Sequence, residues 1–226
     1  MNESGYRPGE RRPIATRDHA ISQRVAAWLA NHGASPNAIS VAGVLAAIIG
    51  GFAFYGTSFG GSWSRPLWLL AAAMAQLRLL ANMFDGMVAI RRKIASPVGE
   101  LYNEVPDRIS DAALFIGLGF AAGGQPFLGM AAALAAVFTA YVRAMAKVVG
   151  APQDFCGPLA KPQRMFLVTV LAVYCATTPH NWQPTWKVGQ QSLGITSGGL
   201  TIIFIGSLVT AGRRLMRAAR YLKEHP

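Results

Sequence analysis

The sequence predicts an all-α integral membrane protein with six transmembrane helices and, before them, an amphipathic helix at the membrane interface. The chain of 226 residues is 52% hydrophobic and only 14% charged. Six apolar runs, each close to the roughly 20 residues that cross a bilayer once flanking turns are added, are Ala38–Tyr55, Pro66–Leu80, Ala112–Gly123, Phe127–Val142, Phe166–Thr177 and Ile195–Thr210. These runs lack the period-two alternation of strands and are rich in Ala, Leu and Gly, so helices are expected to satisfy their backbone hydrogen bonds.

The N-terminal part of the chain differs from the rest. Residues 1–16 are rich in Gly, Pro and Arg, so we expect a basic and flexible segment. This segment has no apolar run of the kind found in signal peptides. Residues 17–34 are expected to form an amphipathic helix that lies in the membrane interface or packs on the bundle. The apolar residues on one face of this helix are Ile21, Val25, Trp28 and Leu29.

The six-helix transmembrane domain is expected over residues 35–212. Its first helix has a start signal in Ser35, a capping residue, and in Pro36, which suits the first turn of a helix. The segment Pro179–Leu193 is expected to be an outer loop, and its two tryptophans suit a membrane interface. Residues 213–226 are expected to form a basic tail on the cytoplasmic side.

Lysine and arginine are distributed unevenly between the two sides of this predicted bundle. With both termini inside, the cytoplasmic side carries Arg7, Arg11, Arg12, Arg17, Arg24, Arg91, Arg92, Lys93, Arg143, Lys147, Lys161, Arg164, Arg213, Arg214, Arg217, Arg220 and Lys223. The opposite side carries Arg65 and Lys187. This asymmetry predicts cytoplasmic termini, in the inner membrane if the source is a bacterium. The net charge of +11 therefore indicates topology and attraction to anionic lipid. It does not indicate nucleic-acid binding, because no basic face is interleaved with stacking aromatic residues.

Polar residues interrupt the second and third predicted spans. An ionisable group within a membrane costs about 2.5–3.5 kcal/mol on insertion scales, so such groups indicate function. The residues are Asn82, Asp85, Asn103, Asp107 and Asp111. Asn82 and Asp85 share one helix face, and the other three recur every four residues along one stripe. Arg78, in the middle of the second span, is expected to pair with an acid or a backbone carbonyl group.

These polar groups are expected to lie at one depth. At about 1.5 Å per helical residue, Asp85 lies ~9 Å and Asn82 ~13 Å from the cytoplasmic end of their helix. Asn103 lies ~6 Å and Asp107 ~12 Å from the same side. A short loop joins the two helices, which are expected to be neighbours, so their polar groups meet just below the cytoplasmic surface. A cluster with oxygen ligands and no His or Cys suits Mg²⁺ or Mn²⁺.

The spacing of this stretch resembles the signature of the CDP-alcohol phosphatidyltransferase family, D-x2-D-G-x2-A-R-x8-G-x3-D-x3-D. The matching positions are Asp85, Gly86, Ala89, Gly99 and Asp107. The departures are Asn82 and Asn103 at the first and third Asp positions, and Ile90 at the Arg position. Further similarity to the family lies in Ser35-Pro36-Asn37, in YVRA at Tyr141–Ala144 and in GPLAKPQRM at Gly157–Met165. The resemblance thus covers most of the chain from Ser35 onward.

The resemblance implies a metal-dependent transferase. A phosphatidyl group would pass from CDP-diacylglycerol to a polar alcohol, phosphorylated or not, with release of CMP and with Mg²⁺ or Mn²⁺ as the cofactor. Asp107 would be the general base on the acceptor hydroxyl group. The implied metal ligands are Asn82, Asp85, Asn103, Asp107 and Asp111, and the implied nucleotide contacts are Asn37, Gly86, Ala89 and Gly99. The resemblance also implies a homodimer embedded in membrane lipid.

The two asparagines change the charge of the implied site. Asn keeps an oxygen ligand but lacks the negative charge of Asp. Asn82 and Asn103 therefore remove two charges from a site that the resemblance assigns to two divalent ions. Metal affinity should fall, and Asp111 could compensate. Either the site is a remodelled active site, or the chain is a non-catalytic relative that binds lipid or nucleotide.

Three basic residues near the cytoplasmic side are expected to bind the acceptor, namely Arg143, Lys161 and Arg164. Guanidinium groups suit phosphate, so glycerol 3-phosphate or an inositol phosphate would fit. The alternative is that these residues are ordinary anchors under the positive-inside rule. Family members with phosphorylated acceptors usually keep all four Asp, which this chain does not.

Other function classes stay open. One is transfer from CDP-choline or CDP-ethanolamine to diacylglycerol, an apolar acceptor that needs no basic pocket. Another is a channel or transporter, which is expected to have discontinuous helices at the membrane midplane. Cys156 and Cys175 are expected to be free thiols in either class, because they lie too far apart along the bundle to form a disulfide.

Overall fold

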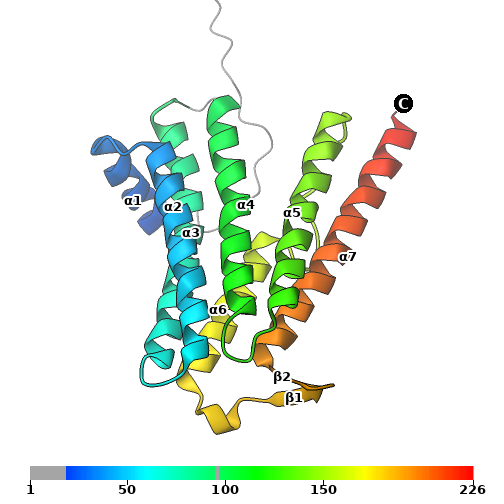
Figure 1. The fold of residues 1–226 in the computed structure, drawn as a ribbon. Coiled ribbons are helices and arrows are strands. Elements are labelled where there is room, and N and C mark those ends of the chain that lie inside the picture. The colour runs from blue at the N-terminus through cyan, green and yellow to red at the C-terminus, as the bar shows by residue number, and fades with distance from the viewer. Residues whose placement is uncertain (1–18, 95–96, 226) are drawn as a thin grey trace, which may run out of the picture.

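The chain folds as a bundle of helices with a β-hairpin at one end (Figure 1). The computed structural model describes residues 19–94 and 97–225. The α-helices are α1 (Ala20–Asn31), α2 (Pro36–Gly56), α3 (Ser64–Arg91), α4 (Pro97–Gly119), α5 (Pro126–Val148), α6 (Lys161–Thr177) and α7 (Ile195–Glu224). The other elements are the 3-10 turns η2 (Thr57–Phe59) and η3 (His180–Trp182) and the antiparallel strands β1 (Thr185–Val188) and β2 (Gln191–Gly194). The predicted flexible segment 1–16 lies outside the described residues.

The two ends of the bundle differ and are named here for what they carry. The hairpin end holds η2, η3 and the β-hairpin, and the C-terminal end is where α7 finishes and where α3 connects to α4 (Figure 1). The hairpin departs from the loop expected over Pro179–Leu193. Strands β1 and β2 pair with each other, with Trp186 opposite Leu193, so part of the expected loop is a regular hairpin.

Six long helices, α2 to α7, occupy the positions of the six predicted spans. Within the described residues, four helices are long and apolar enough to cross a membrane: α2 with η2, α3, α5 and α7. Helix α4 carries charged residues along its length, Asp107 and Asp111 among them, and α6 has 17 residues. The charged residues set α4 apart from an apolar membrane span, and α6 is shorter than such a span. That α4 and α6 cross the membrane therefore stays a prediction.

Helix α1 packs on the bundle beside α3. Its small residues Ser22 and Ala26 are buried, whereas Ile21 and Trp28 on its apolar face are 68% and 59% exposed. The helix thus contacts the protein through small side chains and turns its large apolar side chains outward. A helix that lies in the membrane interface needs outward apolar side chains of this kind. That α1 lies in the interface stays a prediction.

Helix α2 packs against both α3 and α4, which make little contact with each other. Glycines allow these approaches, since a Cβ atom at Gly43 would lie 2.9 Å from Cβ of Ala81 in α3. A Cβ atom at Gly51 would lie 2.6 Å from the carbonyl oxygen of Ala113 in α4. The second and third predicted spans do touch, as expected, through Arg78 and Asn82 of α3 and Asn103 and Asp107 of α4. Each of them nevertheless packs more extensively on α2 than on the other.

The connection between α5 and α6 runs back into the bundle before α6 begins (Figure 1). The carbonyl oxygen of Cys156 accepts a hydrogen bond from Arg214 Nε at 3.0 Å, and the backbone N–H of Leu159 donates to Thr210 Oγ1 at 3.3 Å. Arg214 and Thr210 are one turn apart in the middle of α7, so the connection advances along α7 toward the hairpin end. Helix α6 consequently starts inside the bundle.

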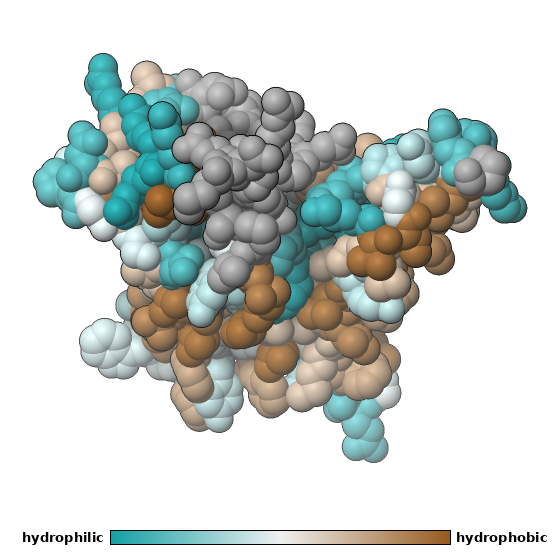
Figure 2. Space-filling model, turned by 90° about the horizontal axis from the view of Figure 1, so that it is seen from above, coloured by the Kyte–Doolittle hydropathy of each residue, from teal (hydrophilic) through white to brown (hydrophobic). Residues whose placement is uncertain are grey.

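The outer surface separates hydrophilic ends from a hydrophobic flank. Seen onto the C-terminal end, hydrophilic residues gather on the side of α1 and on the side where α7 ends, and hydrophobic residues project between them (Figure 2). Large apolar side chains that are exposed along the helices include Leu45, Phe52, Leu134, Phe138, Phe166 and Ile202. Exposed apolar surface on helices of this length indicates contact with lipid, so the fold is membrane-embedded.

Candidate active site

Two asparagines and one aspartate of the predicted site are in direct contact. Asn82 of α3 donates through Nδ2 to Asn103 Oδ1 of α4 at 2.9 Å, and also to Asp107 Oδ1. Successive turns of α4 carry Asn103 and Asp107, so both face Asn82. The structure thus brings the three residues together although α3 and α4 pack mainly on α2.

Asp85 follows Asn82 by one turn and bonds to α2. Its Oδ2 accepts a hydrogen bond from Ser40 Oγ at 2.6 Å, and its Oδ1 accepts one from the backbone N–H of Gly86 at 2.5 Å. Asp85 is 4% exposed. The hydrogen bonds that hold this buried carboxylate therefore come from neutral donors.

Asp107 is held by two cations as well as by Asn82. Arg78 Nη2 forms an ion pair with Asp107 Oδ1, and Lys161 Nζ lies 2.6 Å from the same oxygen. Arg78 is 1% exposed, so its expected pairing with an acid takes place in the interior. The second oxygen, Oδ2, has a longer contact of 3.8 Å to Arg108 Nη2. The ion pairs at short range thus concentrate on Oδ1.

Asp111 lies one turn beyond Asp107 and pairs with α6. Arg164 Nη2 is 3.2 Å from Asp111 Oδ2, and Lys161 Nζ is 3.8 Å from Oδ1. Arg164 also donates to the carbonyl oxygen of Leu159 at 3.2 Å. The side chains of Asp111 and Arg164 are each 2% exposed. Arg164 is therefore the buried counter-ion of Asp111, behind the surface that an acceptor can reach.

Arg143, the remaining predicted acceptor residue, pairs with an acid of α4. Its Nη2 lies 2.6 Å from Glu104 Oε1, and Arg108 binds the same carboxylate at 2.7 Å. The guanidinium group also lies 5.3 Å from the centroid of the Phe155 ring. The side chain of Arg143 is 18% exposed, so this cation stays within reach of a ligand. The side chain of Lys161 is 17% exposed, but its Nζ atom is buried beside Asp107.

The four predicted nucleotide contacts lie at the C-terminal end of the bundle. Asn37 is exposed in the first turn of α2, one turn before Ser40. Ala89 follows Asp85 by four residues on α3, and Gly99 lies in the first turn of α4. Gly86, the fourth, bonds to Asp85 as described above. The starts of α2 and α4 and the end of α3 thus place all four residues at one end.

The oxygen donors of this cluster fit one divalent cation. Asp85 supplies a charged oxygen, and the amides of Asn82 and Asn103 belong to the same cluster and have neutral oxygens of the kind that Mg²⁺ and Mn²⁺ accept. Asp107 and Asp111 differ because cationic side chains already neutralise them. Within the described ranges, no group of three or more His, Cys, Asp or Glu side chains could hold a metal ion.

Two residues of the cluster were not among the predicted site residues, although Arg78 was expected to pair with an acid or a carbonyl group. Ser40 binds Asp85, and Arg78 binds Asp107. A signal existed for Arg78, which precedes Asn82 by four residues and so shares its helix face. No comparable signal existed for Ser40, because its contact joins α2 to α3 across 45 residues of sequence.

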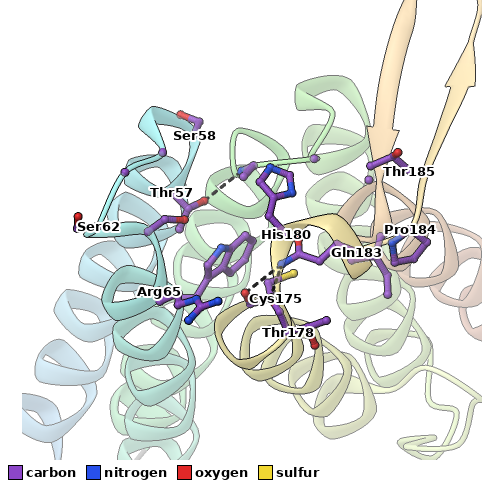
Figure 3. A pocket seen from close by; sticks show the side chains of 18 residues that line it. Thr57, Ser58, Ser62, Arg65, Cys175, Thr178, His180, Gln183, Pro184 and Thr185 are labelled. Carbon is purple, nitrogen blue, oxygen red and sulfur yellow. Dashed lines mark hydrogen bonds between the residues drawn. The ribbon is translucent and has the colours of Figure 1, made fainter.

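A separate cavity of about 540 Å³ lies at the hairpin end (Figure 3). Arg65, His180 and Gln183 line it, and Gln183 Nε2 donates to the carbonyl oxygen of Cys175 at 3.2 Å. None of the predicted site residues lines this cavity. Cys175, at its wall, and Cys156 are free thiols, as predicted. The cavity and the polar cluster therefore occupy different parts of the bundle.

Comparison with known proteins agrees with the resemblance found in the motif. A family model for CDP-alcohol phosphatidyltransferase matches residues 34–209. The chain is 27% identical over 203 residues to the phosphatidylinositol phosphate synthase of Mycobacterium marinum, covering 86% of this chain and 78% of that protein. It is 24% identical over 153 residues to the inner membrane protein YnbA of Escherichia coli, covering 67% and 73%.

Solved structures show the same fold. The phosphatidylinositol phosphate synthase of Mycobacterium tuberculosis, crystallised with manganese and citrate, superposes with a TM-score of 0.69 at 20% identity and covers 88% of this chain and 89% of that chain. The same enzyme with CDP-DAG bound has a TM-score of 0.69 at 21% identity and covers 88% and 94%. The family match extends from the start of α2 into α7 and so includes all six long helices. The chain therefore belongs to the CDP-alcohol phosphatidyltransferase family, with asparagine at two of the acidic positions of its signature.

Proposed function

We propose that this chain transfers a phosphatidyl group from CDP-diacylglycerol to a polar alcohol and releases CMP, with Mg²⁺ or Mn²⁺ as the cofactor. The observation that carries the proposal is the cluster of Asn82, Asp85, Asn103 and Asp107 at one end of a fold shared with a synthase crystallised with manganese and with CDP-DAG. Family membership and the similarity to phosphatidylinositol phosphate synthases support the same reaction.

Asp107 is the proposed general base. The acceptor oxygen attacks the phosphorus that carries the diacylglycerol, the P–O bond to CMP breaks, and the acceptor proton passes to the carboxylate. Oδ2 suits this task because the short ion pairs with Arg78 and Lys161 fall on Oδ1. The proposed metal position is at Asp85, with Asn82 and Asn103 beside it. A divalent cation bound there neutralises negative charge on the phosphate oxygens.

A phosphorylated acceptor is the proposed substrate class. Arg143 supports it as a partly exposed cation, Lys161 supports it as a buried ammonium with no hydrogen-bond acceptor, and the similar phosphatidylinositol phosphate synthases support it by name. Arg164 supports it only indirectly, because this residue is the buried partner of Asp111. An acceptor phosphate would compete with Glu104 for Arg143, whose guanidinium group can turn between the two anions.

The test is CMP release from purified protein with Mn²⁺, CDP-diacylglycerol and a panel of phosphorylated and unphosphorylated alcohols. We expect Arg143→Gln to raise KM for the phosphorylated acceptor by about tenfold or more, because a hydrogen bond to a charged group contributes about 1.5–3 kcal/mol. Lys147→Gln, one turn along the same helix and exposed, is the matched control and should leave KM unchanged.

Each alternative has its own outcome in this assay. Release of CMP from CDP-choline or CDP-ethanolamine with diacylglycerol would replace the proposed substrates. No release from any CDP-linked substrate would make the chain a non-catalytic lipid- or nucleotide-binding relative. Equal KM values of wild type and Arg143→Gln for phosphorylated acceptors would remove Arg143 from the acceptor site.

We also propose that all six long helices span the membrane and that the C-terminal end faces the cytoplasm. The lysine and arginine asymmetry supports this orientation. In intact cells, a membrane-impermeant maleimide should label Lys187→Cys on the hairpin and leave Cys156, which is exposed near the other end, unlabelled. The reverse labelling pattern would invert the topology.

A homodimer is the proposed assembly, on the strength of the family resemblance. The exposed apolar flank offers surface for a second copy as well as for lipid. Light scattering of the detergent-solubilised protein measures its molar mass, and a monomeric mass would contradict the dimer.

A further inference from the structure

The cations that surround Asp107 bear on the number of metal ions that the site can hold. We propose that the Arg78 guanidinium and the Lys161 ammonium take the electrostatic place of one divalent cation, so that the chain binds one such ion and not two. The substrate side of this inference rests on the proposed function, whereas the number of bound ions does not.

The first support is the charge of the cluster. Its carboxylates Asp85, Asp107 and Asp111 are balanced by the cations Arg78, Lys161 and Arg164. Arg108, which also lies near Asp107, is balanced by Glu104. The cluster is therefore formally neutral before any metal binds. Two divalent ions would bring four positive charges to a buried and neutral site, and no further acids are placed at the asparagine positions to offset them. One ion beside Asp85 meets less repulsion from Arg78, Lys161 and Arg164, because these cations pair with the other two acids, Asp107 and Asp111.

The second support is the way in which Asp107 is bound. Its Oδ1 accepts Asn82 Nδ2 and the ion pairs from Arg78 and Lys161. A carboxylate oxygen offers about two lone-pair sites, so this oxygen has no capacity left for a metal ion. The Asn82 amide also turns its NH₂ group toward Asp107 and Asn103, and a cation between these side chains would face a donor instead of a ligand.

The third support is a set of buried donors with capacity to spare. Within the described residues, Arg78 Nε, Lys161 Nζ and Arg164 Nε are buried atoms of this cluster with no hydrogen-bond acceptor. Arg78 and Lys161 are the two beside Asp107, and Lys161 Nζ lies 2.6 Å from Asp107 Oδ1 as an ion pair. This short contact is an electrostatic attraction whose geometry is poor for a hydrogen bond. Buried donors of this kind are satisfied when an anion binds. The phosphate oxygens of a CDP-linked substrate are anions of the class that such donors bind, so Arg78 and Lys161 would offset their charge as a second divalent cation would.

The position of Lys161 makes this substitution possible. The connection before α6 turns back along α7, so the first residue of α6 lies inside the bundle next to α4. A helix that began at the C-terminal end would leave Lys161 too far from Asp107. The course of this connection therefore places one of the two cations, Lys161, beside Asp107.

The experiment is a Mn²⁺ titration of the purified protein in detergent, with free Mn²⁺ followed by electron paramagnetic resonance. Wild type is expected to bind one Mn²⁺ per chain, and Arg78→Met/Lys161→Met is expected to bind two, because Asp107 becomes available. Arg78→Lys keeps the charge and should bind one. Lys147→Met, which removes an exposed lysine, is the matched control and should also bind one.

Two results would overturn the inference: two Mn²⁺ per chain in wild type, or one in a double variant that elutes as a monodisperse, helical protein. If the double variant does not fold, Lys161→Met alone decides, and an unchanged Mn²⁺ isotherm counts against the inference. Failure of the proposed function is seen separately. A chain that binds one Mn²⁺ but releases no CMP contradicts the reaction and leaves the metal count standing.

Discussion

Asp107→Asn is expected to lower the rate of CMP release by about 10²–10⁴-fold, the usual contribution of a general base. The amide has nearly the shape of the carboxylate and can still accept hydrogen bonds from Asn82 and Arg78 through its oxygen. It cannot take the proton of the acceptor hydroxyl group. Loss of the negative charge also leaves two cations in the interior with one acid fewer, so part of the fall reflects weaker positioning of the substrate.

The measurement is steady-state CMP release at saturating acceptor, with helical content checked by circular dichroism. Asp154→Asn makes the same chemical change at an ion pair with Arg217 in the α5–α6 connection, outside the contacts of the cluster, and should leave the rate unchanged. Full activity of Asp107→Asn would show that this carboxylate is not the base. Asp111, one turn further along α4, would then be the next acid to test.

Arg164→Met is expected to lower the free energy of unfolding by about 3–5 kcal/mol, the cost of leaving one partner of a buried ion pair unpaired. Arg164 and Asp111 have side chains that are each 2% exposed and lie 3.2 Å apart, so little water can replace the lost partner. Lys161, 3.8 Å from the other oxygen of Asp111, compensates in part. We therefore expect a value at the lower end of the range.

Equilibrium unfolding in detergent, or the shift in Tm, measures this effect. In the double variant Arg164→Met/Asp111→Leu the loss should be smaller than the sum of the two single losses, because neither partner stays behind as a buried charge. Arg217→Met is the control, since Arg217 is exposed and its pair with the half-buried Asp154 should contribute no more than about 1 kcal/mol. Equal losses in Arg164→Met and Arg217→Met would mean that burial of the Asp111 pair adds nothing.

Much of the candidate site could be read from local spacing. The separation of Asn82 from Asp85 by three residues, and of Asn103 from Asp107 by four, places each pair on one face of a helix whatever the surrounding fold. The apolar runs identify the six long helices for a similar reason, because hydrophobic composition and backbone hydrogen bonding act within a segment. These local features were sufficient to reveal the family.

The partners of the acids depended on packing between distant segments. Arg78 and Asp107 are 29 residues apart in sequence, and Arg164 and Asp111 are 53 apart. Neither pairing follows from helical periodicity, since each requires a particular helix to approach from a particular side. The expectation that Lys161 and Arg164 both line an open acceptor pocket had the same weakness, because it assumed that their helix begins level with its neighbours.

The sequence by itself determined that the chain is a helical membrane protein of this family, with a polar motif in which two acids are replaced by asparagine. Only the tertiary structure decided that α2 lies between α3 and α4, that α6 starts inside the bundle, and that Arg78 and Lys161 face Asp107. The physical reason is that charge neutralisation in the interior depends on distances of a few ångströms between side chains from different helices. Sequence spacing controls those distances within a helix, and packing controls them between helices.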